Sequence, residues 1–333
     1  MEGLDDYDLG DYTQDNGTVE NLYQNVTGAF DGSIASFSYS VMIINVIISL
    51  GGFAGNAVVI WISGWKMKRT VNTTFYLSLA ISDCLFCACL PVNIGYVMTS
   101  HWPFGPVLCK LVSSTLIFNM FSSVFVLVLI SVDRCVMAVF PVWSHNRRTV
   151  KAAVGVLVLT WVLSATLTVP SLLYRSTRAH GGATECYSDY KHNSVHRAVV
   201  LARFVGGFLL PFVVIVSCTA ILYVKLRRLT IKSTKPYKVM VALVLSFFLC
   251  WIPYHTVVFL EVDIRKHDLT LVQTGLAVGT TLAAANSFVN PFLYVFIGNK
   301  FKQTLRRSLM QRMEYAMAED GRTLTPVSQS VRI

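Results

Sequence analysis

Seven long apolar runs, separated by short polar links, account for most of the 333-residue chain. Each run is long enough to cross about 30 Å of hydrocarbon as a helix that rises 1.5 Å per residue. Several runs contain proline, which a helix bundle in lipid tolerates because neighbouring groups satisfy the freed backbone. The pattern predicts an all-α membrane protein, a seven-transmembrane helix bundle. The runs lie near residues 39–64, 73–98, 107–139, 152–173, 198–224, 238–261 and 270–297.

A short eighth helix is expected after the last run. Phe301, Leu305 and Leu309 recur at four-residue spacing with basic residues between them, which is typical of an amphipathic helix on a membrane surface. The predicted organisation has four parts: an acidic N-terminal tail over 1–37, the bundle over 38–298, the amphipathic helix over 299–313 and a C-terminal tail over 314–333.

Composition supports a membrane protein, because 54% of the residues are hydrophobic and only 14% are charged. Soluble domains carry roughly 25% charged residues. The net charge of +10 comes from basic clusters in the links between runs and near the C-terminus. We interpret these clusters as topology signals facing a lipid bilayer, and we expect no nucleic-acid partner.

The distribution of Lys and Arg predicts the orientation. They gather in the links after runs one, three, five and seven, which should therefore face the cytoplasm. The second outer link also carries basic residues, so the rule is obeyed only as a bias. The N-terminus should be extracellular, and Asn16 and Asn25 in its two Asn-x-Thr sequons are expected to be glycosylated.

The first 31 residues hold eight acidic side chains and no Lys or Arg. Tyr7 and Tyr12 lie among these carboxylates, in surroundings that favour tyrosine sulfation. A sulfated tail would attract a basic protein ligand and speed its encounter. The alternative is a plain solvated tail. At the other end, the candidate phosphorylation sites are Thr323, Thr325, Ser328 and Ser330.

Two of the eight cysteines are predicted to face the oxidising side of the membrane. Cys109 lies at the outer end of run three and Cys186 in the second outer link, and we expect them to form a disulfide. Metal binding is the rival interpretation, which the lack of nearby paired histidines disfavours.

Polar residues inside the runs are candidates for function, because burying them in a membrane is costly. Asp83 lies in the middle of run two, and amide and hydroxyl oxygens on other runs are expected around it. Such a cluster could hold Na⁺ or a proton, or it could be purely structural; no other metal or cofactor is expected. The predicted site consists of Asp83, Asn56, Asn119, Ser123 and Asn290.

Six motifs occur in order, one per run, from the first to the fourth and then in the sixth and seventh: "GN", "LAISD", "DRC", Trp161, "FFLCWIPYH" and "NPFLY". Together they resemble the rhodopsin-like (class A) G-protein-coupled receptors over residues 38–312. The stretches "KMKRTVNT", "HWPFG", "FPVWSHNRRTV" and "STKPYKVM" are similar to the chemoattractant branch, and closest to chemerin-type chemokine-like receptors.

The resemblance implies a multi-pass receptor of the plasma membrane, with no enzymatic activity. In its resting state Asp133 would hold Arg134, and outward motion of helix six would free Arg134 to meet a G protein. By analogy with the branch, the partners would be an inhibitory-class heterotrimeric G protein and arrestin. The positions that match the family's packing switch and its helix-seven relay are Phe247, Trp251, Pro253, Asn290, Pro291 and Tyr294.

Two departures from the family pattern concern signalling. No acid precedes run six in "KSTKPYK", so Arg134 lacks a second restraint, and Thr219 stands where the family usually has a tyrosine. A scavenging receptor with weak G-protein coupling therefore stays open as an alternative.

Arg203 lies inside run five and should face the bundle cavity and meet an anion. The resemblance implies that this anion is the C-terminal carboxylate of an extracellular peptide or protein ligand, or that of an acidic lipid agonist. The alternative is a structural salt bridge to Glu261. The other residues expected to line the cavity are Asn93, Tyr96, Trp251, Tyr254 and His255.

Other classes of membrane protein fit poorly. A retinal protein needs a lysine in run seven, and residues 270–297 contain none. A transporter should show repeated halves and several deep charges, and the motifs of intramembrane hydrolases are missing from the sequence.

Overall fold

The computed structural model describes residues 16–99, 101–180, 182–228, 235–262, 267–297, 301–308 and 310. The chain divides into two compact units, Met1–Ile43 and Ile44–Ile333. Helix α1 (Asn16–Trp61) begins in the first unit and ends in the second. Some predictions concern side chains outside the described part of the chain: Tyr7, Tyr12, Asn16, Asn25, Thr323, Thr325, Ser328 and Ser330.

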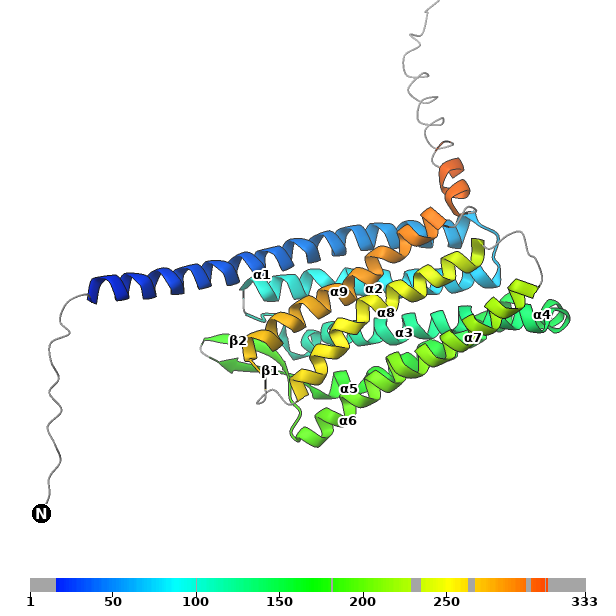
Figure 1. Cartoon of the computed structure of the whole chain (residues 1–333). Helices are drawn as coiled ribbons and strands as arrows, with labels where there is room; N and C mark the ends of the chain where they lie inside the picture. The colour runs from blue at the N-terminus through cyan, green and yellow to red at the C-terminus, as the bar shows by residue number, and fades with distance from the viewer. Residues whose placement is uncertain are drawn as a thin grey trace, which may run out of the picture. The chain divides into compact units, whose positions relative to one another are not determined.

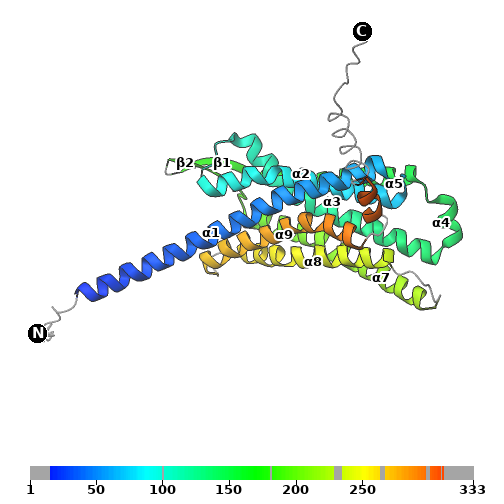
Figure 2. The same cartoon turned by 90° about the horizontal axis from the view of Figure 1, so that it is seen from above.

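The unit Ile44–Ile333 is a bundle of long helices (Figures 1 and 2), and their positions match the apolar runs within a few residues. Helix α3 packs against α2, α5 and α7, and α8 packs along α9. The long helices are α2 (Val71–Thr99), α3 (Gly105–Val139), α5 (Val150–Tyr174), α7 (Leu210–Arg228), α8 (Lys235–Val262) and α9 (Leu269–Ile297), and a short helix α4 (Pro141–Arg147) follows α3.

Six of the expected seven spans are helices long and apolar enough to cross a membrane. The fifth of them joins α6 (Asn193–Phe204), a π-helical turn η2 (Val205–Leu209) and α7. The seventh expected span, α9, has 29 residues, but its described residues do not reach the mean hydropathy of the other six. Four of its polar side chains are buried and face the protein interior: Thr281, Asn286, Ser287 and Asn290.

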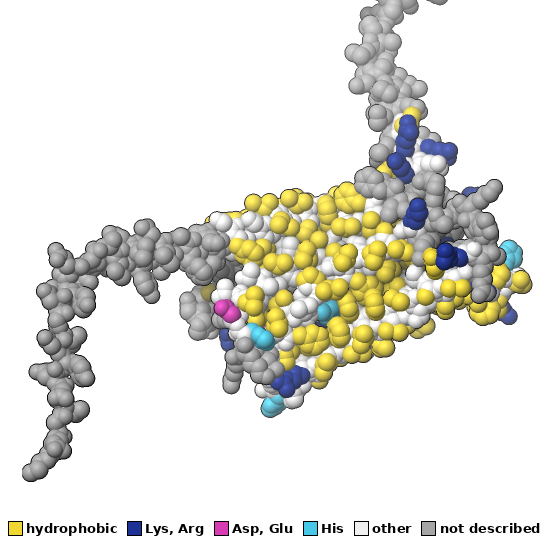
Figure 3. Space-filling model, in the orientation of Figure 1, with side chains coloured by type: hydrophobic (Ala, Val, Ile, Leu, Met, Phe, Trp, Pro, Cys, Tyr) yellow, Lys and Arg dark blue, Asp and Glu magenta, His cyan; other side chains and the backbone are white. Residues whose placement is uncertain are grey.

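The outer surface of the bundle is apolar. Large hydrophobic side chains point outward on several helices, for example Leu159 with 68% and Leu249 with 67% exposed. Figure 3 shows hydrophobic side chains across the visible face, with Lys and Arg toward the ends of the helices. A soluble protein rarely exposes so large an apolar surface, and lipid is the environment that fits it.

One end of the bundle carries an antiparallel hairpin that the helical prediction did not include, β1 (Arg175–His180) paired with β2 (Ala183–Ser188). We call this the hairpin end. A signal for it exists in the sequence, since Gly-Gly at 181–182 is a dipeptide that tight hairpins favour, and the described Gly182 has a φ of 82°.

The hairpin is tied to α3 and to the link before it. The predicted disulfide between Cys109 and Cys186 is present, with 5.7 Å between the two Cα atoms. The Trp102 N–H donates to the Thr184 carbonyl oxygen at 2.8 Å, and the Thr184 N–H donates to His101 Nδ1 at 3.0 Å. These contacts fix the second link across the hairpin end of the bundle.

The opposite end of α3 carries Asp133 and Arg134, and we call it the Arg134 end. The described residues 301–308 are helical there, as the amphipathic pattern predicts. Phe301 is buried in the main core cluster and Leu305 packs against it, whereas Arg306 and Arg307 are exposed.

The π-helical turn η2 lies between Arg203 and Pro211. Pro211 has no N–H and its ring crowds the preceding turn, so a widened turn there relieves the clash. One extra residue in a turn rotates the residues before it by about 100° around the helix axis. The turn therefore helps to set the direction in which Arg203 points.

Candidate functional site

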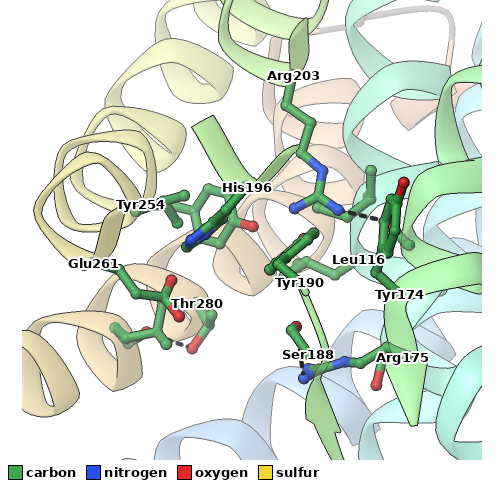
Figure 4. Close-up of a pocket in the computed structure, with 15 residues that line it drawn as sticks. Leu116, Tyr174, Arg175, Ser188, Tyr190, His196, Arg203, Tyr254, Glu261 and Thr280 are labelled. Atoms are coloured by element: carbon green, nitrogen blue, oxygen red, sulfur yellow. Dashed lines mark hydrogen bonds between the residues drawn. The ribbon is translucent and has the colours of Figure 1, made fainter. Parts of the chain in front are cut away.

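A cavity of about 150 Å³ lies at the hairpin end, lined by residues of α3, α5, the hairpin, α6, α8 and α9 (Figure 4). Three of the predicted ligand-binding residues line it: Arg203, Tyr254 and Glu261. Residues that the prediction missed include Tyr174, Arg175, Tyr190, His196 and Thr280.

Arg203 reaches from α6 into this cavity toward Tyr190 (Figure 4). One terminal nitrogen of its guanidinium donates to Ser171 Oγ on α5 at 2.9 Å. Its Nε is buried without a hydrogen-bond partner. The alternative prediction, a salt bridge to Glu261, is wrong, because no ion pair joins these two described residues. The guanidinium therefore keeps donors available for an anion.

Arg175 supplies a second guanidinium, which sequence reasoning counted only as a charge of the outer link. It lines the same cavity from β1 and donates to Ser188 Oγ at 3.1 Å. Burial lowers the pKa of Arg175, while the acidic groups of Tyr254, Tyr190 and Glu261 act in the opposite direction. With two guanidinium groups and one carboxylate, the cavity favours a negatively charged ligand.

Four predicted lining residues are not among those that line this cavity. Tyr96 packs edge-on against Trp102, with 5.4 Å between ring centroids. His255 lies among aromatic rings, 5.6 Å from that of Phe204. Asn93 and Trp251 also lie outside the lining. Trp251 and His255 share α8 with the cavity residue Tyr254, so membership of the right helix did not suffice to place them in the lining.

The predicted packing switch is a stack of rings in α8. Phe247 and Trp251 are fully buried, with centroids 5.8 Å apart, and Trp251 meets the cavity residue Tyr254 edge-on at 5.5 Å. Pro253 lies inside the helix, between Trp251 and Tyr254 in the sequence. Because the two rings are in contact, a ligand that displaces Tyr254 would act directly on the position of Trp251.

Asp83 is fully buried and accepts hydrogen bonds from three neutral groups. Asn119 Nδ2 donates to one carboxylate oxygen at 2.9 Å and Ser287 Oγ donates to the same oxygen at 2.8 Å. Asn290 Nδ2 donates to the other oxygen at 2.8 Å. The structure thus joins three of the predicted residues and adds Ser287, which the prediction missed.

The remaining two predicted members of this cluster do not contact the carboxylate. Asn56 Nδ2 donates to the carbonyl oxygens of Gly52 and Ser287, at 2.8 and 2.9 Å. Ser123 Oγ and Asn56 Oδ1 are buried without hydrogen-bond partners. In the described part of the chain, three or more His, Cys, Asp or Glu side chains nowhere converge on one point.

At the Arg134 end, the expectation that Asp133 holds Arg134 is wrong. Arg148, which follows α4, donates from Nε and Nη2 to the two Asp133 oxygens at 2.7 and 3.0 Å. Its Nη2 also donates to Asn72 Oδ1 at 2.8 Å. The physical reason is that adjacent residues of a helix point in different directions and do not face each other.

Arg134 instead lies beside the hydroxyl of Tyr76, and its Nε is buried without a partner. The Tyr76 ring packs against Tyr294 with 5.0 Å between centroids. Tyr294 follows Asn290 and Pro291 in α9, and Asn290 binds Asp83. Side-chain contacts, joined by the turn of α9 from Asn290 to Tyr294, therefore connect the buried carboxylate with Arg134.

The arrangement matches a known family. The family model "7 transmembrane receptor (rhodopsin family)" matches residues 55–294. The chain belongs to this family. It is therefore a multi-pass membrane receptor of the G-protein-coupled type and not an enzyme. The order of helices, the disulfide and the buried polar cluster described above are those of this receptor's transmembrane domain.

The curated relatives are chemoattractant receptors. Chemerin-like receptor 1 of Sus scrofa is 36% identical over 340 residues, covering 93% of each chain. Chemerin-like receptor 1 of Homo sapiens is 38% identical, covering 84% of this chain and 80% of the relative. The C3a anaphylatoxin chemotactic receptor of Oncorhynchus mykiss is 38% identical, covering 81% of this chain and 76% of the relative. This receptor is thus of the chemerin-like and C3a receptor type.

Proposed function

We propose that this receptor recognises a chemoattractant-type peptide or protein whose C-terminal carboxylate binds Arg203. The single observation that carries the proposal is a cavity-lining guanidinium with no carboxylate partner. Arg175 is proposed to assist, because it adds a second cation to the same cavity. The names of the relatives, which refer to chemerin and to C3a, support a ligand of this class.

The proposal includes an extracellular N-terminus at the plasma membrane, for which the charge distribution is the support. Glycosylation of Asn16 and Asn25 and sulfation of Tyr7 and Tyr12 would then occur on the ligand side. On the other side we propose an inhibitory-class G protein at Arg134. Arrestin would bind the tail after phosphorylation of Thr323, Thr325, Ser328 and Ser330.

A double cycle tests the carboxylate contact. Arg203→Ala should lower agonist affinity roughly 30-fold or more, because truncating one member of a buried charge pair costs about 2–5 kcal/mol. Amidating the C-terminus of the peptide agonist should cost the wild-type receptor about as much, and the Arg203→Ala receptor much less. Binding of both peptides to both receptors is measured with a labelled agonist.

Arg178→Ala is the matched control, because Arg178 also lies in the outer link but pairs with Glu185 on the exposed hairpin. It should bind both peptides with wild-type preference. Equal losses on amidation in wild type and Arg203→Ala would remove Arg203 from the ligand site.

The second candidate ligand is an acidic lipid mediator, and the small size of the cavity favours it. If the ligand is a lipid acid, esterifying its carboxylate should lower its affinity as much as amidation lowers that of a peptide. Deleting the acidic N-terminal tail should then leave affinity unchanged. Ligand uptake without inhibition of cAMP synthesis would instead indicate a scavenging receptor.

We further propose that Na⁺ binds at Asp83 and opposes activation. The carboxylate is buried and meets only neutral donors, so a proton or a small cation is needed to neutralise it. The oxygens of Asn56 and Ser123 have no hydrogen-bond partner and are further ligands that suit a hard cation. The Asp83 carboxylate would hold the ion together with these two oxygens, and the ion would stabilise the resting packing.

Replacing Na⁺ by a large organic cation should therefore raise agonist affinity about fivefold or more in the wild type. Asp83→Asn should abolish this dependence, because the amide carries no charge. Cys84→Ala, at the neighbouring half-buried position, should retain it. Radioligand binding in the two media decides the matter, and an unchanged affinity in the wild type would leave Asp83 with a structural role only.

A further inference from the structure

Arg203 and Tyr174 line a second hollow in addition to the cavity at the hairpin end. This groove, of about 480 Å³, lies between α5 and α6, with Phe121 of α3 among its lining residues. Ala198 and Ala202 on α6 are exposed, as is Leu173 on α5. Since these residues face outward on membrane-spanning helices, the groove opens toward lipid.

The position of Arg203 explains why it belongs to both hollows. Its backbone is part of α6, and its guanidinium donates across the gap to Ser171 on α5. Arg203 and Tyr174 thus form the boundary between the groove and the inner cavity. The residue that carries this guanidinium therefore faces both hollows.

Charge and polarity indicate what fits the groove. Its walls are mostly apolar, from Phe121 and Pro170 to Ala198 and Ala202, and Arg203 is its one charged lining residue. The buried Nε of that guanidinium has no partner. Apolar walls favour an alkyl chain, and a guanidinium within the membrane favours an anion.

We propose that a long-chain fatty acid from the bilayer binds in this groove. Its alkyl chain lies between α5 and α6 against Phe121, and its carboxylate binds Arg203. The site goes beyond the proposed peptide recognition, because it is reached from the lipid and requires no agonist. Occupancy competes for the guanidinium that the peptide carboxylate would use, so the fatty acid acts as a negative modulator of the receptor.

The test uses the full chain in nanodiscs of phosphatidylcholine. The probes are a long-chain fatty acid with a photoreactive diazirine in its chain and the matching primary alcohol. We expect saturable labelling of peptides from α5 and α6, with the acid favoured over the alcohol about tenfold or more, because only the acid pairs with Arg203. Arg203→Gln should remove this preference.

Two substitutions fill the groove from the lipid side. Ala202→Trp and Ala198→Phe should each abolish saturable labelling, and unlabelled acid should no longer lower agonist affinity in these receptors. Ala220→Trp is the control, because Ala220 is exposed on α7 and outside the groove.

Equal labelling by acid and alcohol in the wild type would overturn the proposal. So would labelling that persists in both groove variants while they elute as folded monodisperse protein. Because the labelling needs no agonist, it can fail while the Arg203 peptide cycle succeeds, and the reverse also holds.

Discussion

Replacing Gly279 by alanine is expected to push α8 away from α9 and to remove most of the receptor from the cell surface. A Cβ atom at residue 279 would lie 2.9 Å from Cα and 3.1 Å from N of Tyr254. These are backbone atoms, so no rotation of a side chain can make room. Overpacking of this kind costs about 1–3 kcal/mol, and here it acts at the turn that carries the cavity residue Tyr254.

The measurements are surface expression of tagged receptor and the thermal unfolding midpoint in detergent. Gly155→Ala is the matched control, because a Cβ there meets no atom within 4 Å. That change should leave expression intact or improve it slightly, since alanine favours helix over glycine by up to about 1 kcal/mol. Equal expression of the two variants would show that α8 and α9 can separate at Gly279 without penalty.

The spans could be predicted closely because lipid imposes a length on every apolar run. The exception in hydropathy, α9, shows the limit of that argument. Its buried Asn286, Ser287 and Asn290 lower its mean hydropathy, yet they face the interior and add no polar surface toward lipid. The hairpin β1–β2 was not predicted, because each strand has only six residues and gives no long apolar run.

The sequence predicted functional residues correctly where knowing the helix and the depth of each residue was enough to place it. Asp83, Asn119 and Asn290 meet because they lie at similar depths on α2, α3 and α9. A sequence indicates the depth of a residue in the membrane more readily than the direction of its side chain. Tyr96 and His255 were therefore predicted to line the cavity, although they turn away from it. Arg175 was missed because the hairpin that carries it lies over the bundle through tertiary contacts, the Cys109–Cys186 disulfide among them.

The pairing of Asp133 illustrates the same limit. Its neighbour in sequence, Arg134, faces another direction, while Arg148 is 15 residues later and reaches both carboxylate oxygens. The two arginines therefore have different surroundings. Arg148 neutralises the Asp133 carboxylate, which is largely shielded from water. Arg134 lies beside Tyr76, and among the described residues it forms no ion pair with a carboxylate.

This difference predicts separable effects of two substitutions. Arg148→Ala would leave the Asp133 carboxylate and Asn72 Oδ1 without their donor, at a cost of about 1–3 kcal/mol for a stranded group. We expect a lower thermal midpoint and reduced expression. Arg134→Ala strands no carboxylate, so we expect near-wild-type expression and measurable agonist binding.

Signalling should show the opposite order. Arg134→Ala should abolish agonist-stimulated nucleotide exchange on the G protein, because the series of contacts from Asp83 through Asn290, Tyr294 and Tyr76 ends at this guanidinium. Arg148→Ala should still activate the G protein in proportion to the receptor that reaches the surface. Exchange is measured with purified receptor and G protein, normalised to bound agonist. Wild-type exchange by Arg134→Ala would show that the signal leaves the bundle by another route, and full loss in Arg148→Ala at normal agonist binding would place Asp133 within that route.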